Sequence, residues 1–364
     1  MTAQAVARSA VQPVAVGKVQ AYRPVLGWAT AGACFITFFA YLIVRWVTSG
    51  HFTPTPAGDV PTYTRVAADV WQAATVIGVP ILIWRLVVRP YRNEGALSVD
   101  GVMTIAFLTC WWQDTICNSL AVFTTNSAAF INFGSWDNYI PGWVQPHGNR
   151  IVEPLFGSSG MMYLWAPLGM AALATKVMRR LQAAGRGRGL QLATSVAILA
   201  VVTCACELVA VRLGLWAYQG AHRSWSIFAG TRYQYPVYEG FFIAVLATAW
   251  GAVRFYRDDK GQTIVERGLE DVKISNRRKQ GLRVLAMSGV LNVVMLGCWE
   301  LPMAHIAATQ DAWPTSLVQL QHLTNSVCGA GSDRACPGPA VPISRPGSAY
   351  VDINGNLQPP PARK

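Results

Sequence analysis

The sequence predicts an all-α, polytopic membrane protein, a bundle of about seven transmembrane helices. Three observations predict this fold: 52% of the 364 residues are hydrophobic, only 13% are charged, and the charges gather between long apolar runs. A soluble domain usually carries about 25% charged residues. The net charge of +12 would suit nucleic acid. However, no basic face with interleaved aromatic residues is present, so we expect no nucleic-acid partner.

Seven stretches are apolar enough to span a bilayer, which requires about 20 residues. In chain order they are Val25–Val47, Ala67–Val88, Gly101–Phe123, Ser159–Met178, Leu190–Leu213, Pro236–Tyr256 and Leu282–Met303. The first exceeds the ~7–15 apolar residues of a cleavable signal peptide, so we expect it to remain as an anchor. The second is the weakest prediction, because it contains Asp69, Gln72 and Pro80.

Basic residues predict the orientation of the bundle, because cytoplasmic loops carry an excess of Lys and Arg. Twenty of the thirty Lys and Arg residues fall in four segments, 1–24, Arg85–Arg92, Lys176–Arg188 and Arg254–Arg283. All four lie on one side of the membrane when the N-terminus is inside. We therefore predict a multi-pass protein of the cell membrane with a cytoplasmic segment 1–24, a transmembrane domain 25–303 and an extracytoplasmic tail 304–364.

Two outer loops, 124–158 and 214–235, are long and rich in large aromatic residues. They could form an interfacial aromatic belt, or a cap over a pocket, since loops of this length are seldom mere linkers. In the tail, Cys328 and Cys336 flank a polar loop, and an oxidising compartment would let them form a disulfide. The Pro-rich end of the tail, its last ~15 residues, is predicted to be disordered.

Acidic residues inside the predicted helices are the strongest functional signal, because an ionisable group at membrane depth is costly. There are five, Asp69, Asp114, Glu207, Glu239 and Glu300, and the helix directions place all five in the outer half of the membrane. The five histidines, His51, His147, His222, His305 and His322, lie toward the same side. We therefore predict a polar pocket in which buried carboxylic acids can donate protons.

Asp114 and Glu239 are the leading catalytic candidates, with Glu207 as a third. The expected substrate-binding residues are Trp111, Trp112, Asn118, Tyr235, Tyr238, Glu300 and Asp69. Asn118 follows Asp114 by four residues, which is one helical face. A structural role is also open for three of the acids: Glu207 could pair with Arg212, and Asp69 and Glu300 could lie at wet helix ends. No metal or cofactor site is predicted, because no two histidines are spaced i,i+4 and no nucleotide-binding motif occurs.

Several long segments carry a family resemblance. They are Trp111–Asp114, Asn132–Trp143, Glu153-Pro154, Phe228–Glu239, Phe255–Asp259 and Cys336–Pro339. Together they resemble the AveC-like spirocyclase family over roughly residues 25–348. The resemblance implies a membrane enzyme that closes a dihydroxy-ketone polyketide into a spiroketal, and can dehydrate it, without a redox cofactor. It supplies no catalytic residues, so the candidates above rest on depth and chemistry.

Spiroketal closure suits a pocket of acids and aromatic rings, since a protonated acid expels water and an ionised one stabilises the oxocarbenium ion. Two alternatives remain open. One is a terpenoid- or carotenoid-type cyclase or hydratase. The other is a non-catalytic lipid- or sterol-binding subunit of an envelope complex, with a membrane protein as its partner. In every case the expected surroundings are the lipid bilayer and a lipophilic small molecule.

Overall fold

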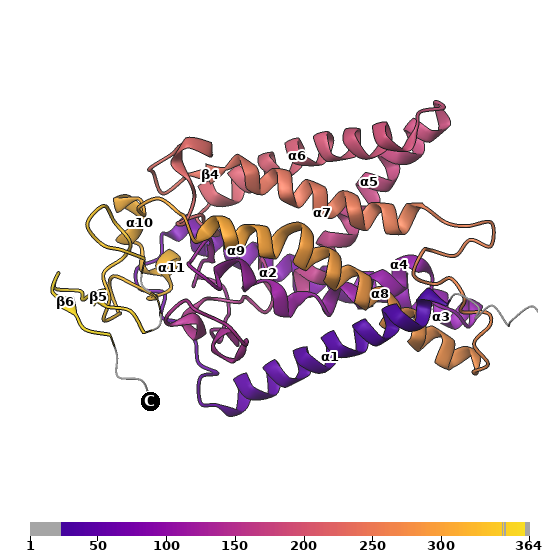
Figure 1. The fold of residues 1–364 in the computed structure, drawn as a ribbon, viewed down its shortest axis with the longest axis horizontal. Helices are drawn as coiled ribbons and strands as arrows, with labels where there is room; N and C mark the ends of the chain where they lie inside the picture. The colour runs from indigo at the N-terminus through magenta and orange to yellow at the C-terminus, as the bar shows by residue number, and fades with distance from the viewer. Residues whose placement is uncertain (1–22, 344, 346, 361–364) are drawn as a thin grey trace, which may run out of the picture.

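The computed structural model describes residues 23–343, 345 and 347–360. Long helices run along one axis of the molecule (Figure 1). Six helical segments of this part of the chain are long and apolar enough to cross a membrane. They are α1 (Pro24–Thr48), α2 with its π turn and α3 (Thr62–Ile83, Trp84–Val88, Arg89–Glu94), a 3-10 turn with α5 (Gly160–Leu164, Ala166–Ala183), α6 (Arg188–Arg212), α7 (Val237–Phe255), and α8 with its π turn and α9 (Asn276–Met295, Leu296–Glu300, Leu301–Ala307). The predicted helical membrane bundle is confirmed.

The third predicted span, Gly101–Phe123, is not a continuous helix. Helix α4 ends after ten residues, Val99–Leu108, and the chain continues through the 3-10 turns Trp111–Gln113 and Ile116–Asn118. Irregular backbone at membrane depth is tolerated only where protein surrounds it, and most side chains of this segment are buried. Polar groups among the apolar residues make the break possible: the Thr109 hydroxyl, for example, donates to the carbonyl of Ala106 at 2.6 Å.

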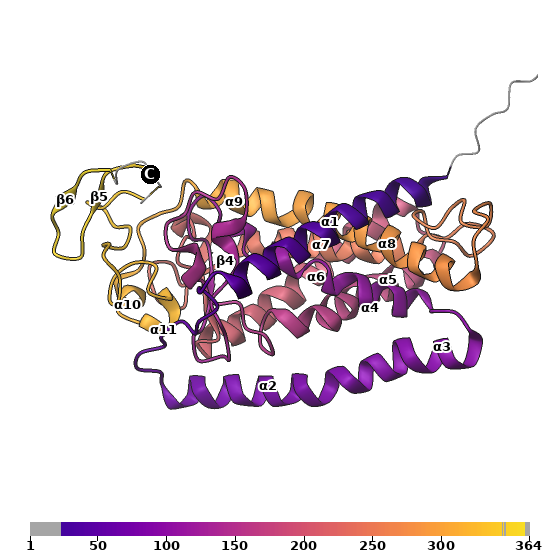
Figure 2. The ribbon, with the colours of Figure 1, turned by 90° about the horizontal axis from the view of Figure 1, so that it is seen from below.

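Two glycines let α1 and α8 pack with their backbones almost in contact. A Cβ atom added at Gly32 would lie 1.9 Å from the Leu285 carbonyl oxygen, and one at Gly289 would lie 2.2 Å from that of Trp28. Such small-residue crossings are typical of membrane helices. In contrast, α2 runs apart from the bundle along much of its length (Figure 2).

The connections gather at the two ends of the bundle (Figure 1). At the basic end, residues 95–98, 184–187 and 256–275 join the helices, and Arg254 binds the carboxylate of Asp100 through two nitrogens at 2.7 and 2.8 Å. Residues 109–159, 213–236 and the described part of 308–360 form the opposite end, here called the cap. The basic segments predicted to share one side therefore lie together, as far as the structure describes them.

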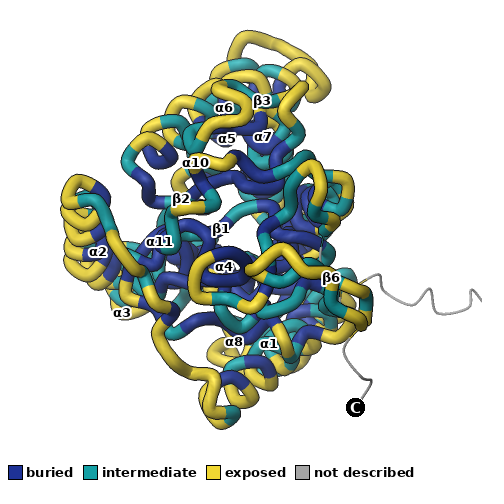
Figure 3. Tube along the Cα trace, turned by 90° about the vertical axis from the view of Figure 1, so that its left-hand side faces the viewer, coloured by how far each residue is buried: buried dark blue, intermediate teal, exposed yellow. Residues whose placement is uncertain are grey.

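Short strands tie the cap together. β1 (Thr125–Asn126) pairs with β2 (Trp216–Ala217), which joins the two aromatic loops, and β3 (Ser226–Ile227) pairs with β4 (Tyr235–Pro236). Seen from the cap end, buried residues lie at the centre of the molecule (Figure 3). Both loops are therefore part of the packed structure, as the cap interpretation requires.

The tail also folds onto the cap, through α10 (Thr315–Val318) and α11 (Gln321–Thr324). The predicted disulfide between Cys328 and Cys336 is present. The expected disorder at the end of the tail is wrong for residues 350–358, because β5 (Tyr350–Val351) pairs with β6 (Leu357–Gln358). The final residues, 361–364, lie outside the described part of the chain.

Candidate active site

A cavity of about 160 Å³ lies under the cap, and four carboxyl groups line it. They come from four separate segments: Asp114 from the irregular stretch after α4, Glu153 from the first aromatic loop, Glu207 from α6 and Glu239 from the first turn of α7. This space is here called the carboxyl cavity. Because the four residues are up to 125 positions apart in sequence, only the packing of the bundle brings them together.

Asp114 and Glu153 form the first pair, and their carboxyl groups are close enough to influence each other's protonation. The Tyr163 hydroxyl donates to Asp114 Oδ1 at 2.6 Å, and the Ser159 hydroxyl donates to Glu153 Oε2 at 2.6 Å. The Trp111 indole donates to the same Glu153 oxygen at 3.3 Å. Burial, reinforced by the neighbouring Asp114 carboxyl, raises the pKa of Glu153 well above its usual range. Two neighbouring buried acids do not both ionise readily, so this pair favours a protonated form.

Glu207 and Glu239 form the second pair. Glu207 Oε2 accepts from the Trp216 indole at 2.6 Å and from the Tyr218 hydroxyl at 2.7 Å. Glu239 Oε2 accepts from the Tyr235 hydroxyl at 2.8 Å. The rings of Tyr218 and Tyr235 pack edge to face, with centroids 5.5 Å apart. Burial raises the pKa of both tyrosines, so their hydroxyls stay protonated and act as donors.

The structure brings several of the predicted site residues together. Asp114, Glu207, Glu239 and Asn118 line the carboxyl cavity, while Trp111 and Tyr235 support its acids by donating hydrogen bonds. Asn118 lines the cavity from a 3-10 turn rather than from the predicted helical face. Its Oδ1 accepts hydrogen bonds from the backbone amides of Phe123 and Thr124 at 2.7 and 3.1 Å.

Four predicted site residues lie elsewhere. Trp112 packs against Phe35 and Phe38 and donates to Asn292 Oδ1 at 3.0 Å. The Tyr238 hydroxyl accepts the backbone amide of His222 at 3.2 Å. Glu300 is buried behind the site and accepts the backbone amide of Cys117 at 3.1 Å, and Asp69 lies on the exposed face of α2.

The structural alternative for Glu207, an ion pair with Arg212, is not found. Instead of pairing with that acid, the Arg212 guanidinium lies between the rings of Phe228 and Tyr233, 4.3 and 4.5 Å from their centroids. A guanidinium stacked on aromatic faces is stabilised by their quadrupoles. Glu207 is thus left facing the cavity, with neutral hydrogen-bond donors around it.

Sequence reasoning missed Glu153, Tyr163, Trp216 and Tyr218 as site residues. Glu153 lies in a loop, where no helical period marks depth, and its only signal was the Glu153-Pro154 segment of the family resemblance. The histidines, by contrast, do not line the cavity; His147, for instance, pairs with Asp333 at 2.9 Å. Among the described residues, no group of three or more His, Cys, Asp and Glu side chains is placed to hold a metal ion.

The profile of the family described as Spirocyclase AveC-like matches residues 96–322, more than half of the chain. The chain belongs to this family. All four carboxyl residues of the cavity fall inside the range matched by the AveC-like spirocyclase profile, whereas α1, α2 and the end of the tail fall outside it. The match is therefore narrower than the 25–348 expected from the resemblance. No match was found among curated proteins or solved structures.

Membership of the AveC-like spirocyclase family supports a function of the cyclase or dehydratase type. The site is compatible with such chemistry, because ring closure with loss of water requires a proton donor, a proton acceptor and a shielded space. The carboxyl cavity offers carboxyl groups for these roles: Glu153 and Glu239 are buried, Asp114 and Glu207 are partly buried, and all four accept hydrogen bonds.

Proposed function

We propose that this protein is a membrane-embedded, acid-catalysed cyclase that converts a lipophilic dihydroxy ketone into a spiroketal, with dehydration as a related activity. One observation carries the proposal: two pairs of carboxyl groups face a single small cavity. Carboxyl pairs in different surroundings are the usual means of holding a general acid and an ionised partner at the same pH.

The proposed reaction consumes a dihydroxy ketone and releases the spiroketal and one water. One substrate hydroxyl adds to the ketone carbon and gives a hemiketal. A carboxylic acid then protonates the hemiketal hydroxyl, the C–O bond breaks, and water leaves an oxocarbenium ion. The second hydroxyl attacks that carbon, and its proton passes to a carboxylate, which restores the catalyst. No electrons are transferred overall.

We assign the proton donor to the pair Asp114 and Glu153, because two neighbouring carboxyl groups surrounded by uncharged donors disfavour double ionisation. We assign stabilisation of the cation to Glu207 and Glu239. Glu207 accepts two hydrogen bonds at one oxygen, the arrangement expected of a carboxylate. A carboxylate already positioned beside the carbon where positive charge develops stabilises the transition state strongly in a site with little water.

The polar wall of the cavity favours an oxygenated substrate over a plain polyene. Asn118, Thr124 and Asn126 line the cavity beside the acids, and the Asn126 Oδ1 accepts the Ser158 hydroxyl at 2.6 Å. Substrate hydroxyls and a ketone could form hydrogen bonds with these groups, whereas a hydrocarbon polyene could form none. This feature supports the spiroketal reaction over the terpenoid-type alternative.

The decisive experiment incubates the purified protein in lipid nanodiscs with a synthetic dihydroxy ketone and follows the product by mass spectrometry. Wild type should yield a compound lighter by one water. Asp114→Asn should lower turnover by roughly 10²–10⁴-fold, the usual contribution of acid–base catalysis. Glu239→Gln should lower it by roughly 10²–10³-fold through the loss of electrostatic stabilisation. The matched control is Asp69→Asn, an exposed carboxyl of α2, which should retain turnover.

Two results would contradict the proposal. If Asp114→Asn and Glu239→Gln both kept full turnover, the assignment of these acids would be wrong. If wild type bound the ketone and returned it unchanged, the protein would be a lipid-binding subunit rather than an enzyme.

A further inference from the structure

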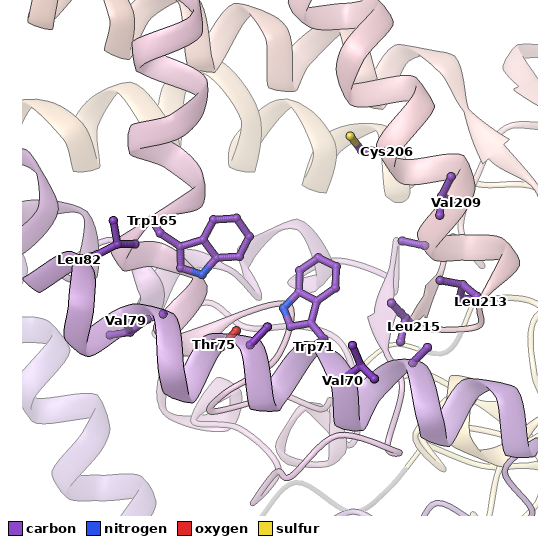
Figure 4. Close-up of a pocket in the computed structure, with 14 residues that line it drawn as sticks. Val70, Trp71, Thr75, Val79, Leu82, Trp165, Cys206, Val209, Leu213 and Leu215 are labelled. Carbon is purple, nitrogen blue, oxygen red and sulfur yellow. The ribbon is translucent and has the colours of Figure 1, made fainter.

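A second, larger space lies beside the carboxyl cavity, between α2 and α6. It measures about 560 Å³ and is almost wholly apolar. In Figure 4 the indoles of Trp71 and Trp165 face this space from α2 and from the start of α5. This lateral groove is lined by, among others, Trp71, Gly78, Val79, Trp165, Val209 and Leu213.

The Trp216 indole forms part of the wall between the lateral groove and the carboxyl cavity. The Trp216 ring lines the carboxyl cavity and donates to Glu207. Its other neighbour is the Trp71 ring of the groove, which it meets edge to face with centroids 5.9 Å apart. Leu215 lines the groove and the next residue lines the cavity. A molecule long enough to pass this wall would therefore touch both spaces.

The outer side of the lateral groove faces the membrane. Helix α2 stands away from the bundle (Figure 2), and Val70 and Val209, on opposite sides of the groove, are 64% and 61% exposed. Such surfaces face lipid in a helix that spans a bilayer. An apolar groove at this place offers no hydrogen bonds to water, so hydrocarbon is its natural occupant.

The sizes of the two spaces complement each other. Ligand pockets usually measure about 300–1,000 Å³, so the carboxyl cavity at about 160 Å³ holds only the oxygenated, ring-forming part of a lipophilic ketone. The groove, at about 560 Å³, has room for an alkyl chain. We infer that the lateral groove binds the apolar chain of the substrate and admits it from the bilayer past Trp71. This inference rests on the proposed function.

Gly78 offers a clean test, because a Cβ atom there meets no other atom within 4 Å. Gly78→Leu places an isobutyl group on this wall of the groove, and its Cβ atom has open space. The probe is a dihydroxy ketone with a twelve-carbon alkyl tail that ends in a photoreactive diazirine. In wild type, irradiation should label groove peptides of α2 and α6. In Gly78→Leu, labelling of those peptides should fall roughly tenfold, the loss expected when about two methylenes are displaced.

The matched control is Gly27→Leu in α1, where an added Cβ also meets nothing within 4 Å and which lies outside both cavities; it should label like wild type. A second probe carries the same tail and diazirine without the dihydroxy ketone, and should show no preference for the groove. This comparison in wild type stands even if Gly78→Leu does not fold.

The inference is overturned if the headless probe labels the groove as strongly as the ketone, since the groove would then hold any membrane lipid. It is also overturned if the ketone labels other surfaces, or if Gly78→Leu leaves the labelling unchanged. Failure of the proposed function gives a different result from failure of this inference. In that case wild type would dehydrate neither the tailed ketone nor a short ketone with the same head group, whatever the labelling pattern.

Discussion

At the scale of single residues, the site depends on acids whose neighbours are mostly hydrogen-bond donors without charge. Trp111, Ser159 and Tyr163 surround the first pair, and Trp216 and Tyr218 surround Glu207. Within the described structure no cation lies at ion-pair distance from Asp114 or Glu153, so we expect a proton to compensate this first pair. Glu207, in contrast, is stabilised by two uncharged donors at one oxygen. This difference is the basis for proposing the first pair as the proton donor.

This environment makes the stability of the protein depend on pH. Burial raises the pKa of Glu153, so the folded protein keeps a proton that the unfolded chain releases above about pH 4.3. The contribution to the free energy of unfolding is therefore full below that pH and is lost as pH rises toward the folded pKa.

We expect Glu153→Gln, which cannot ionise in either state, to show a smaller fall in Tm between about pH 5 and about pH 8 than wild type. Thermal unfolding in detergent at the two pH values measures this difference, with Asp69→Asn as the exposed control. An equal fall in wild type and Glu153→Gln would refute the raised pKa.

At the scale of elements, two features distinguish this bundle from a set of uniform helices. One is the close crossing of α1 and α8 at Gly32 and Gly289. The other is the early end of α4, after which the chain turns irregularly and presents Asp114 to the cavity. If the helix had continued, the direction of the Asp114 side chain would follow from the helical period. Instead, the two 3-10 turns after α4 set that direction.

The glycine crossing predicts a steric effect. Gly32→Ala places a methyl group where the Leu285 carbonyl oxygen would be 1.9 Å away, so the helices must separate at a cost of about 1–3 kcal/mol. Unfolding in detergent should show this loss of stability. Gly27→Ala, in the same helix but with open space around it, serves as the control and should match wild type; similar values for the two variants would argue against the crossing.

The irregular segment after α4 depends on Asn292 of α8. Its Oδ1 accepts hydrogen bonds from the Trp112 indole at 3.0 Å and from the Gln113 amide at 2.5 Å. Asn292→Ala should leave the Trp112 indole unpaired, while Gln113 keeps its bond to the backbone carbonyl of residue 292 at 3.4 Å. We expect a destabilisation of roughly 1–3 kcal/mol, the cost of one unpaired buried group. Val293→Ala changes the next, exposed residue and is the control. Equal Tm values would show that the segment does not need Asn292.

At the scale of the whole molecule, the cap closes one end of the bundle and brings three distant parts of the chain together. Asn325 of the tail shows how: its Oδ1 accepts the backbone amide of Val152 at 2.9 Å, and its Nδ2 donates to the carbonyl of Asn126 at 3.0 Å. Asn126 lines the carboxyl cavity. The tail therefore holds the cavity wall in place, besides covering it.

The basic end is expected to face the cytoplasm and the cap the opposite side, because Lys and Arg gather at that end. Alkaline phosphatase fused after Lys364 should be active, since it folds only outside the cytoplasm, and fused after Glu270, in the connection before α8, it should be inactive. Green fluorescent protein at the same two positions should give the opposite pattern. Active phosphatase after Glu270 together with inactive phosphatase after Lys364 would reverse the orientation.

The sequence alone determined the features that depend on local composition. Continuous apolar runs predicted the helical bundle because each span must be apolar over its own length, and acids within those runs pointed to Asp114, Glu207 and Glu239, which do share a cavity. The long family-like segments predicted the family that the profile match shows.

Only the tertiary structure decided what depends on residues far apart in the chain. The break after α4 depends on buried partners such as Asn292, which local apolarity does not reveal. The position of Glu153 depends on how the first aromatic loop of the cap folds back toward the helices. Glu300 and Asp69, in contrast, satisfied the same local criterion as the cavity acids but point elsewhere. The physical reason is that depth in a membrane is a property of one helix, whereas the direction of a side chain is set by the neighbours against which that helix packs.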